Sequence, residues 1–243
     1  MAFFSRLYIR RKKKKRRISM SLITGILEQL INGLRTGSIY ALIAIGYTMV
    51  YGIAKMINFA HGDIIMVGAY SLYVFTAVLN LPAAASVILT VVVCAVLGIV
   101  VERIAYKPLR NAPSLAVLIT AIGVSYFLQN TALLIFKATP IPFGSIINVS
   151  GIRLGNINIS GVTLVTFIVT VVMMVGLTLF INKTKAGSAM RAVSEDRGAA
   201  SLMGINVNKT ISMTFAIGSA LAAVAGILLS LIHISSPRDT ERC

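Results

Sequence analysis

Three polar side chains that stand close together in this chain could do chemistry: Asn58, His61 and Asp63, in the motif INFAHGD. Imidazole and carboxylate groups act as metal ligands and as general acids and bases. His61 and Asp63 alone are too few for a metal site, and no further metal-ligand spacing exists in the chain. No nucleophile–base arrangement and no phosphate-binding glycine loop is visible either. We therefore expect no catalytic residue, no metal and no cofactor on this chain, and no ATP hydrolysis by it.

The surroundings of this motif indicate another role for its polar side chains. Asn58, His61 and Asp63 lie between two apolar stretches and are costly at membrane depth unless they face protein, a cavity or water. We take all three as candidates for lining a translocation path. Gly52 and Gly62 flank the motif and favour a broken or re-entrant segment at 52–62. A plainer alternative is that Asn58 or Asp63 caps a helix at the membrane interface.

The elements around the motif are apolar enough to cross a bilayer. Hydrophobic residues make up 57% of the chain, charged residues make up 12%, and the mean hydropathy is +0.87. A membrane-spanning helix needs about 20 mostly apolar residues. Because the apolar windows lack the alternation of a membrane β-barrel, we expect an all-α membrane protein, a polytopic bundle of about six transmembrane helices. The windows are Gly37–Gly52, Gly62–Leu79, Ala83–Val101, Leu115–Phe136, Val162–Ile181 and Ile211 onward.

A second polar segment, residues 183–209, separates the last two windows. It holds five of the chain's basic residues and two of its seven acids. Its small residues let another surface approach the backbone closely; they are Gly187, Ala192, Ala199, Ala200 and Gly204. A helical segment of this kind on one side of a bilayer is typical of a docking site for a soluble partner. The alternative is a helix that is merely solvated.

The positions of Lys and Arg predict the orientation, because cytoplasmic loops carry an excess of both. The connection 103–110 carries three bases and residues 183–209 carry five, whereas the longer connection 137–161 carries two. We therefore expect the 183–209 loop and the 54–61 link in the cytoplasm. The N-terminal residues before Gly37 are then outside.

The two ends of the chain depart from this pattern. Nine of the 23 basic residues lie within residues 1–19, and Arg16-Arg17 is what the ribosome-binding sequence AGG AGG would encode. Residues 229–234 are similar to a translated transposase adapter from DNA library preparation. We therefore expect a native transmembrane domain over residues 20–228, with residues 1–19 and 229–243 foreign to it. We do not take the net charge of +16 as evidence for nucleic acid. A solvated tail and a signal-peptide n-region are the alternatives for the basic head.

The spacing of small residues predicts where helices pack. Gly33 and Gly37 form a GxxxG pair, and Gly218, Ala222 and Gly226 continue the same spacing near the end of the chain. Residues 139–160 hold prolines, glycines and alternating Ile, Asn and Val. We expect them to be an outer loop that forms a short hairpin or docks an external partner.

Two long segments resemble one protein family. Residues 36–70, TGSIYALIAIGYTMVYGIAKMINFAHGDIIMVGAY, resemble the permease subunits of bacterial branched-chain amino acid ABC importers of the LivH type. Residues 186–228, AGSAMRAVSEDRGAASLMGINVNKTISMTFAIGSALAAVAGIL, resemble the coupling region of the same subunits. Related permeases for urea, short amides and other amino acids share much of this pattern and are alternatives. Family members continue through further spans, so the intact protein is expected to have more than six.

The resemblance implies an importer with several subunits. A second permease subunit completes the path, cytoplasmic ATP-binding subunits that hold ATP-Mg drive it, and a periplasmic or lipid-anchored solute-binding protein delivers the substrate in the bacterial inner membrane. Residues 183–209 would be the coupling loop on the ATPase. We expect one helix from Gly187 to Met203, with an Arg191–Glu195 pair worth about 0.2–0.5 kcal/mol and Gly204 ending it at positive φ. The coupling residues are Gly187, Arg191, Glu195, Asp196, Ala199, Ala200 and Gly204.

An alternative from another class is a self-contained channel or secondary carrier, with INFAHGD lining its pore. Carriers that are driven by ions need acidic groups inside their spans. We expect both Asp63 and Glu102 at span boundaries, with Glu102 ending the third span at the membrane interface. This placement favours the importer that is driven by ATP.

Overall fold

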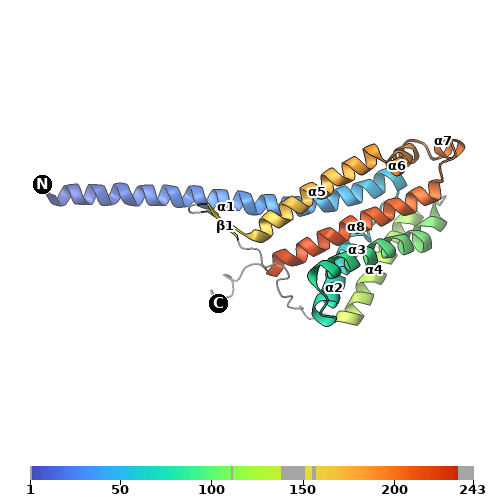
Figure 1. The fold of residues 1–243 in the computed structure, drawn as a ribbon, viewed down its shortest axis with the longest axis horizontal. Coiled ribbons are helices and arrows are strands. Elements are labelled where there is room, and N and C mark those ends of the chain that lie inside the picture. Colours follow the sequence, from blue (N-terminus) through green and yellow to red (C-terminus); the bar gives the residue numbers. More distant parts are fainter. Residues whose placement is uncertain (1, 111, 138–150, 155–156, 235–243) are drawn as a thin grey trace.

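The structure, a computed structural model, describes residues 2–110, 112–137, 151–154 and 157–234 and shows a bundle of long helices (Figure 1). Two short helices follow the fifth long one, and an antiparallel hairpin precedes it. The long helices are α1 (Ala2–Ala54), α2 (His61–Tyr73), α3 (Ala83–Val101), α4 (Ser114–Phe136), α5 (Gly161–Lys183) and α8 (Val207–Ile234). The short helices and strands are α6 (Lys185–Glu195), α7 (Arg197–Leu202), β1 (Ile152–Leu154) and β2 (Ile157–Ile159).

Two of the long helices are extended by irregular turns. Helix α2 continues in a π-helical turn, η1 (Val74–Val78). Helix α3 continues through a second π-helical turn, η2 (Glu102–Tyr106), and a 3₁₀ turn, η3 (Lys107–Leu109). The third apolar segment is therefore longer than its sequence window.

Six of the described helical segments are long and apolar enough to cross a membrane, which confirms the predicted fold class. They are Gly25–Ala54, His61–Val78, Ala83–Leu109, Ser114–Phe136, Gly161–Lys183 and Val207–Leu231. Two boundaries were predicted wrongly. The first span does not begin at Gly37 but lies within the continuous helix α1, and the third does not end at Val101 but continues to Leu109. A glycine in a helix interior costs about 1 kcal/mol but keeps its N–H, so good helix formers on both sides carry the helix through it.

Helix α8 is the centre of the bundle and packs on α1, α2 and α3. A Cβ at Gly218 would meet Val50 of α1 at 2.6 Å, and one at Gly226 would meet the carbonyl oxygen of Ile65 in α2 at 2.4 Å. Ala222 between them is fully buried. The predicted packing stripe of α8 is therefore confirmed. A Cβ added at Gly33 or Gly37 would meet no atom of the described residues within 4 Å, so this GxxxG pair does not pack helices together within the chain.

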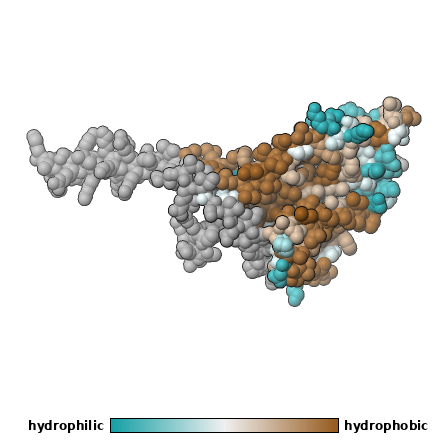
Figure 2. Space-filling view, viewed as in Figure 1, coloured by the Kyte–Doolittle hydropathy of each residue, from teal (hydrophilic) through white to brown (hydrophobic). Residues whose placement is uncertain are grey.

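The bundle has a polar end where α6 and α7 lie (Figures 1 and 2). The α1–α2 link, the α3–α4 connection and the start of α8 lie at the same end, while the N-terminus and the hairpin β1–β2 lie toward the other. Between the ends the visible surface is mainly apolar, as lipid contact requires (Figure 2).

The outer loop predicted over 139–160 is described only in part. Strand β1 pairs with β2, with Ile152 opposite Ile159, so its last residues do form a short hairpin. Residues 138–150 lie outside the described residues, as do residues 235–243 of the C-terminal segment expected to be foreign. The boundary expected at Met20 falls within α1.

Candidate functional site

The link between α1 and α2 is the break that the sequence predicts at 52–62. Helix α1 ends at Ala54 and α2 begins at His61, and Lys55 turns the chain with a φ of 53°. Met56 and Ala60 of the link are buried. The link therefore packs into the polar end of the bundle instead of projecting as a solvated loop.

Asn58 is held inside this link. The hydroxyl of Tyr106, in η2, donates a hydrogen bond to Asn58 Oδ1 at 3.0 Å, and both residues are buried. The backbone carbonyl of Asn58 accepts from the N–H of His61 at 3.2 Å. Helix α2 has Ala60 at its N-cap and no side-chain capping bond, so the alternative that Asn58 or Asp63 caps it is wrong.

His61 faces α1. Its ring lies edge-on to that of Tyr47, with ring centroids 5.9 Å apart. A Cβ on Gly46 would lie 3.2 Å from His61 Cε1, so the glycine makes room for the imidazole. His61 is buried, and its Nε2 has no hydrogen-bond partner among the described residues.

Asp63 faces α4 instead. Gln129 Nε2 donates to Asp63 Oδ1 at 2.9 Å and lies 3.1 Å from Ser125 Oγ. Asp63 Oδ2 is buried without a partner among the described residues. Sequence reasoning missed Gln129, although a polar amide in an apolar window is a signal that could have found it.

The three motif residues thus point at three different neighbours: Asn58 at η2, His61 at α1 and Asp63 at α4. They do not form one constellation. No group of three or more His, Cys, Asp or Glu side chains in the described part of the chain could hold a metal ion. All three are buried, and two of them, His61 and Asp63, each have a side-chain atom without a hydrogen-bond partner among the described residues.

Helix α6 lies against the bundle along an apolar face. Met190 and Val193 are fully buried, and Gly187 is buried so closely that a Cβ would lie 2.3 Å from the carbonyl oxygen of Ile181 in α5. Thr184 starts the helix, because its Oγ1 accepts from the N–H of Gly187 at 3.0 Å. Gly187 therefore serves the close contact between α6 and α5.

Two details of the predicted coupling helix are wrong. The helix is interrupted at Asp196, whose extended backbone and side chain cap α7: Asp196 Oδ1 accepts from the N–H groups of Gly198 at 2.6 Å and Ala199 at 3.0 Å. Aspartate competes for backbone N–H groups in this way and favours the N-cap. Arg191 does not pair with Glu195, the last residue of α6, because it reaches back to Asn182 Oδ1 at 3.1 Å.

The end of α7 is an exposed apolar tip. Leu202 is 90% exposed and Met203 is 82% exposed, whereas Ala200 is buried and Ala199 is exposed. Gly204 follows at a φ of 80°, which confirms that it ends the helix at positive φ. Sequence reasoning missed Leu202 and Met203, although two large apolar residues in a polar segment are a visible signal.

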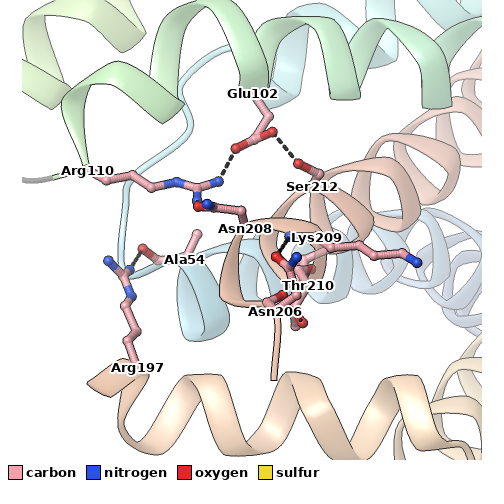
Figure 3. A network of polar contacts seen from close by, with 10 residues as sticks. Ala54, Glu102, Arg110, Arg197, Asn206, Asn208, Lys209, Thr210 and Ser212 are labelled. Carbon is pink, nitrogen blue, oxygen red and sulfur yellow. Dashed lines mark hydrogen bonds and ion pairs between the residues drawn. The ribbon is translucent and has the colours of Figure 1, made fainter. Parts of the chain in front are cut away.

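A polar network ties the start of α8 to the end of the third span (Figure 3). Glu102 is fully buried, accepts from Ser212 Oγ at 2.5 Å and pairs with Arg110, which also donates to Asn208. The prediction that Glu102 ends the third span at the membrane interface is therefore wrong, because the helical segment continues beyond it to Leu109. Its charge is tolerated in the interior because Arg110 and Ser212 compensate for the lost water. Because Glu102 lies inside its span, the placement of the acids does not exclude a carrier that is driven by ions.

Arg197 attaches α7 to the rest of the bundle. Its guanidinium donates to the backbone carbonyl oxygen of Ala54, the last residue of α1 (Figure 3). Burial, together with the nearby positive charge of Arg110, lowers the pKa of Arg197. An arginine stays charged under such shifts. The α6–α7 segment is thereby attached to the same link that holds Asn58.

The chain is similar to known proteins over most of its length. A family model described as branched-chain amino acid transport system / permease component matches residues 29–240. The high-affinity branched-chain amino acid transport system permease protein BraD of Pseudomonas aeruginosa is 45% identical over 219 residues, which covers 84% of this chain and 71% of BraD.

Two more relatives show how far the similarity extends. The permease protein LivH of the same transport system in Escherichia coli K12 is 44% identical over 219 residues, 85% of this chain and 71% of LivH. The probable branched-chain amino acid transport permease protein LivH of Methanocaldococcus jannaschii is 30% identical over 205 residues, 81% of this chain and 64% of that protein. No solved structure matches this chain. By its six membrane-spanning helices and by this similarity, the chain belongs to the family of branched-chain amino acid transport permeases.

Proposed function

We propose that this chain is a permease subunit of an ABC importer that carries branched-chain amino acids across the bacterial inner membrane. The names of its relatives support this substrate. We further propose that a second permease subunit completes the path and that a periplasmic or lipid-anchored solute-binding protein delivers the substrate. Nucleic acid has no part in this proposal.

The observation that carries the proposal is the apolar tip of α7. Helix α7 lies at the polar end of the bundle (Figure 1), and Leu202 and Met203 at its end are almost fully exposed. Exposed apolar groups rimmed by polar ones mark interaction sites. A cytoplasmic ATP-binding subunit, which holds ATP-Mg, is the partner we propose for this tip. Basic residues gather at the same end, as expected for the cytoplasmic side; those with described side chains include Lys55, Arg103, Lys107, Arg110, Arg197 and Lys209.

The contacts of α7 provide a route from the ATPase to the membrane. Arg197 joins α7 to the end of α1, and the buried link that follows holds Asn58. A shift of α7 on the ATPase would therefore act on the segment that carries Asn58, His61 and Asp63, our candidates for the path. The unused polar atoms of His61 and Asp63 are available to a passing substrate or water.

Uptake of radiolabelled leucine tests this function, in cells that express the chain with the partner genes of its locus. Replacing the tip by Leu202→Ser with Met203→Ser should lower uptake at least about tenfold, because a loss of roughly 1.4 kcal/mol of docking energy is a factor of ten in occupancy. Gly204→Val should abolish uptake while membrane insertion is unchanged, since valine is strained at positive φ. Ser201→Ala, an exposed neighbour, is the matched control.

The outcomes separate the proposal from its alternatives. Normal uptake by the Leu202→Ser, Met203→Ser variant would contradict docking through α7. Competition of leucine uptake by urea, short amides or other amino acids would reassign the substrate. Uptake that continues without ATP would favour a self-contained channel or carrier.

A further inference from the structure

A pocket at the polar end carries an excess of positive charge. It has a volume of about 310 Å³ and lies between the end of α1, the start of α4 and α7. Three basic residues, Lys55, Arg110 and Arg197, line it together with Ser114, Tyr51 and apolar side chains. None of the described residues that line it is acidic. Neither the translocation path nor the docking tip proposed above uses this pocket.

Only one of these three charges is balanced by an acid. Arg110 pairs with Glu102, the one salt bridge among the described residues, and its Nε is buried without a partner. Arg197 bonds to the neutral carbonyl of Ala54, and exposed Lys55 lies in the same pocket. Two guanidinium groups enter this region from different elements (Figure 3), and burial together with the charge of Arg110 lowers the pKa of Arg197. Lys55 and Arg197, the two charges of the pocket without an acidic partner, favour an anion between them.

Helix α4 adds to this field. Ser114, its first residue, lines the pocket, so the positive end of the dipole of a 23-residue helix faces the same space. Free backbone N–H groups at such an end bind phosphate oxygens.

Part of the pocket lining is exposed, and exposed apolar side chains of α4 lie close to it in sequence. Tyr51 and Ile57 in its lining are 49% and 37% exposed. On α4, Leu115 is 64% exposed and Ile119, one turn further into the span, is 61% exposed. Basic pockets at the cytoplasmic ends of membrane helices take anionic headgroups. An acyl chain attached to a headgroup in this pocket would have an apolar helix face to lie on.

We propose that this pocket binds the phosphodiester headgroup of an anionic phospholipid of the cytoplasmic leaflet. Lys55 and Arg197 contact the phosphate, the N-terminus of α4 faces it, and the acyl chains lie along Leu115 and Ile119. The proposal rests on the cytoplasmic orientation of this end stated above. Since Arg197 also holds the end of α1, the lipid would brace the junction between α7 and the α1–α2 link.

Lipid retention on the purified full chain tests this site. Native mass spectrometry would count phosphatidylglycerol and phosphatidylcholine retained from an equimolar mixture. The wild type should prefer phosphatidylglycerol, and Lys55→Gln should weaken that preference about fivefold, the effect of one cation near a membrane surface. Lys107→Gln, which removes an exposed base at the same end outside this pocket, is the matched control and should change nothing.

A second variant tests the same pocket without removing a contact that holds the fold. Ser114→Asp places a fixed anion at the helix N-terminus, which stabilises the helix and occupies the pocket, so retention of phosphatidylglycerol should disappear. Ser114→Asn is its neutral control and should retain the lipid. Inorganic phosphate at millimolar concentration should compete only weakly, since it lacks the acyl contacts.

Three results would overturn the proposal: equal retention of the two lipids by the wild type, unchanged retention in Ser114→Asp and Lys55→Gln, or displacement of the lipid by phosphate alone at the same affinity. A preference that appears only with the ATP-binding subunit present would assign the pocket to that protein instead. None of these measurements involves transport. A failed uptake assay therefore does not contradict lipid binding, and a failed lipid-retention experiment does not contradict the importer proposal.

Discussion

At the scale of single residues, the decisive feature is how buried charge is compensated at the polar end. Glu102 has no exposed surface, yet each of its oxygens has a partner, Arg110 for one and Ser212 for the other. These partners come from the connection after η3 and from α8, so the pair closes two elements onto each other. Removing one member of such a pair leaves an unpaired charge inside the protein.

Glu102→Ala should therefore destabilise the folded chain by about 3 kcal/mol, since Arg110 is left without its counter-charge. Glu102→Gln should cost less, because the amide oxygen still accepts from Ser212. Thermal unfolding of the purified protein in detergent measures both. Glu195→Ala, at an exposed acid, is the control and should leave the unfolding temperature unchanged. Equal unfolding temperatures for Glu102→Ala and Glu195→Ala would show that the pair contributes nothing.

At the scale of elements, helix α8 determines the packing. About 67% of its most apolar window is buried, against 11% for α4. Three close backbone contacts fix it, through Gly218 to α1, Gly226 to α2 and Gly98 of α3 to Ser219. In lipid such contacts replace the hydrophobic driving force that packs helices in water.

Gly226→Ala should lower the free energy of unfolding by about 1–3 kcal/mol, because its Cβ would overlap the carbonyl oxygen of Ile65 and force the helices apart. Gly123→Ala in α4 is the matched control, with no atom within 4 Å, and should be neutral or stabilising since alanine favours a helix. Denaturant titration of helicity compares the two. A control that loses as much stability as Gly226→Ala would refute the packing account.

At this scale the sequence predicts most of the membrane spans and the packing face of α8, but not the contacts between distant segments. Apolar length placed four of the six spans closely, and the stripe of Gly218, Ala222 and Gly226 predicted the face of α8. What failed depends on contacts between distant segments: Glu102 was read as a boundary residue because its partners Arg110 and Ser212 are joined to it only by folding. The break at Asp196 was not predicted, although aspartate is one of the residues that favour the N-cap of a helix.

At the scale of the whole molecule, the two ends of the bundle differ in charge and in shape. One end has the buried link, the charged pocket and the apolar tip of α7, all joined by the contacts of Arg197, Arg110 and Glu102 (Figure 3). Such an arrangement can pass a movement of α7 to the start of the path. The motif runs from this end into the bundle: His61 packs on Gly46 of α1, and Asp63 bonds to Gln129, which lies fifteen residues into α4. The sequence singled out these residues but not the neighbours that hold them.

The most direct test of the central claim is site-specific photo-cross-linking from Leu202 in cells that hold the partner genes. A photoreactive residue at Leu202 should capture an ATP-binding protein, identified by mass spectrometry. The same residue at Leu134, which is 83% exposed on α4, should capture none. Capture of no ATP-binding protein from Leu202, in a chain that still imports leucine, would contradict the account, because α7 would then not be the docking element.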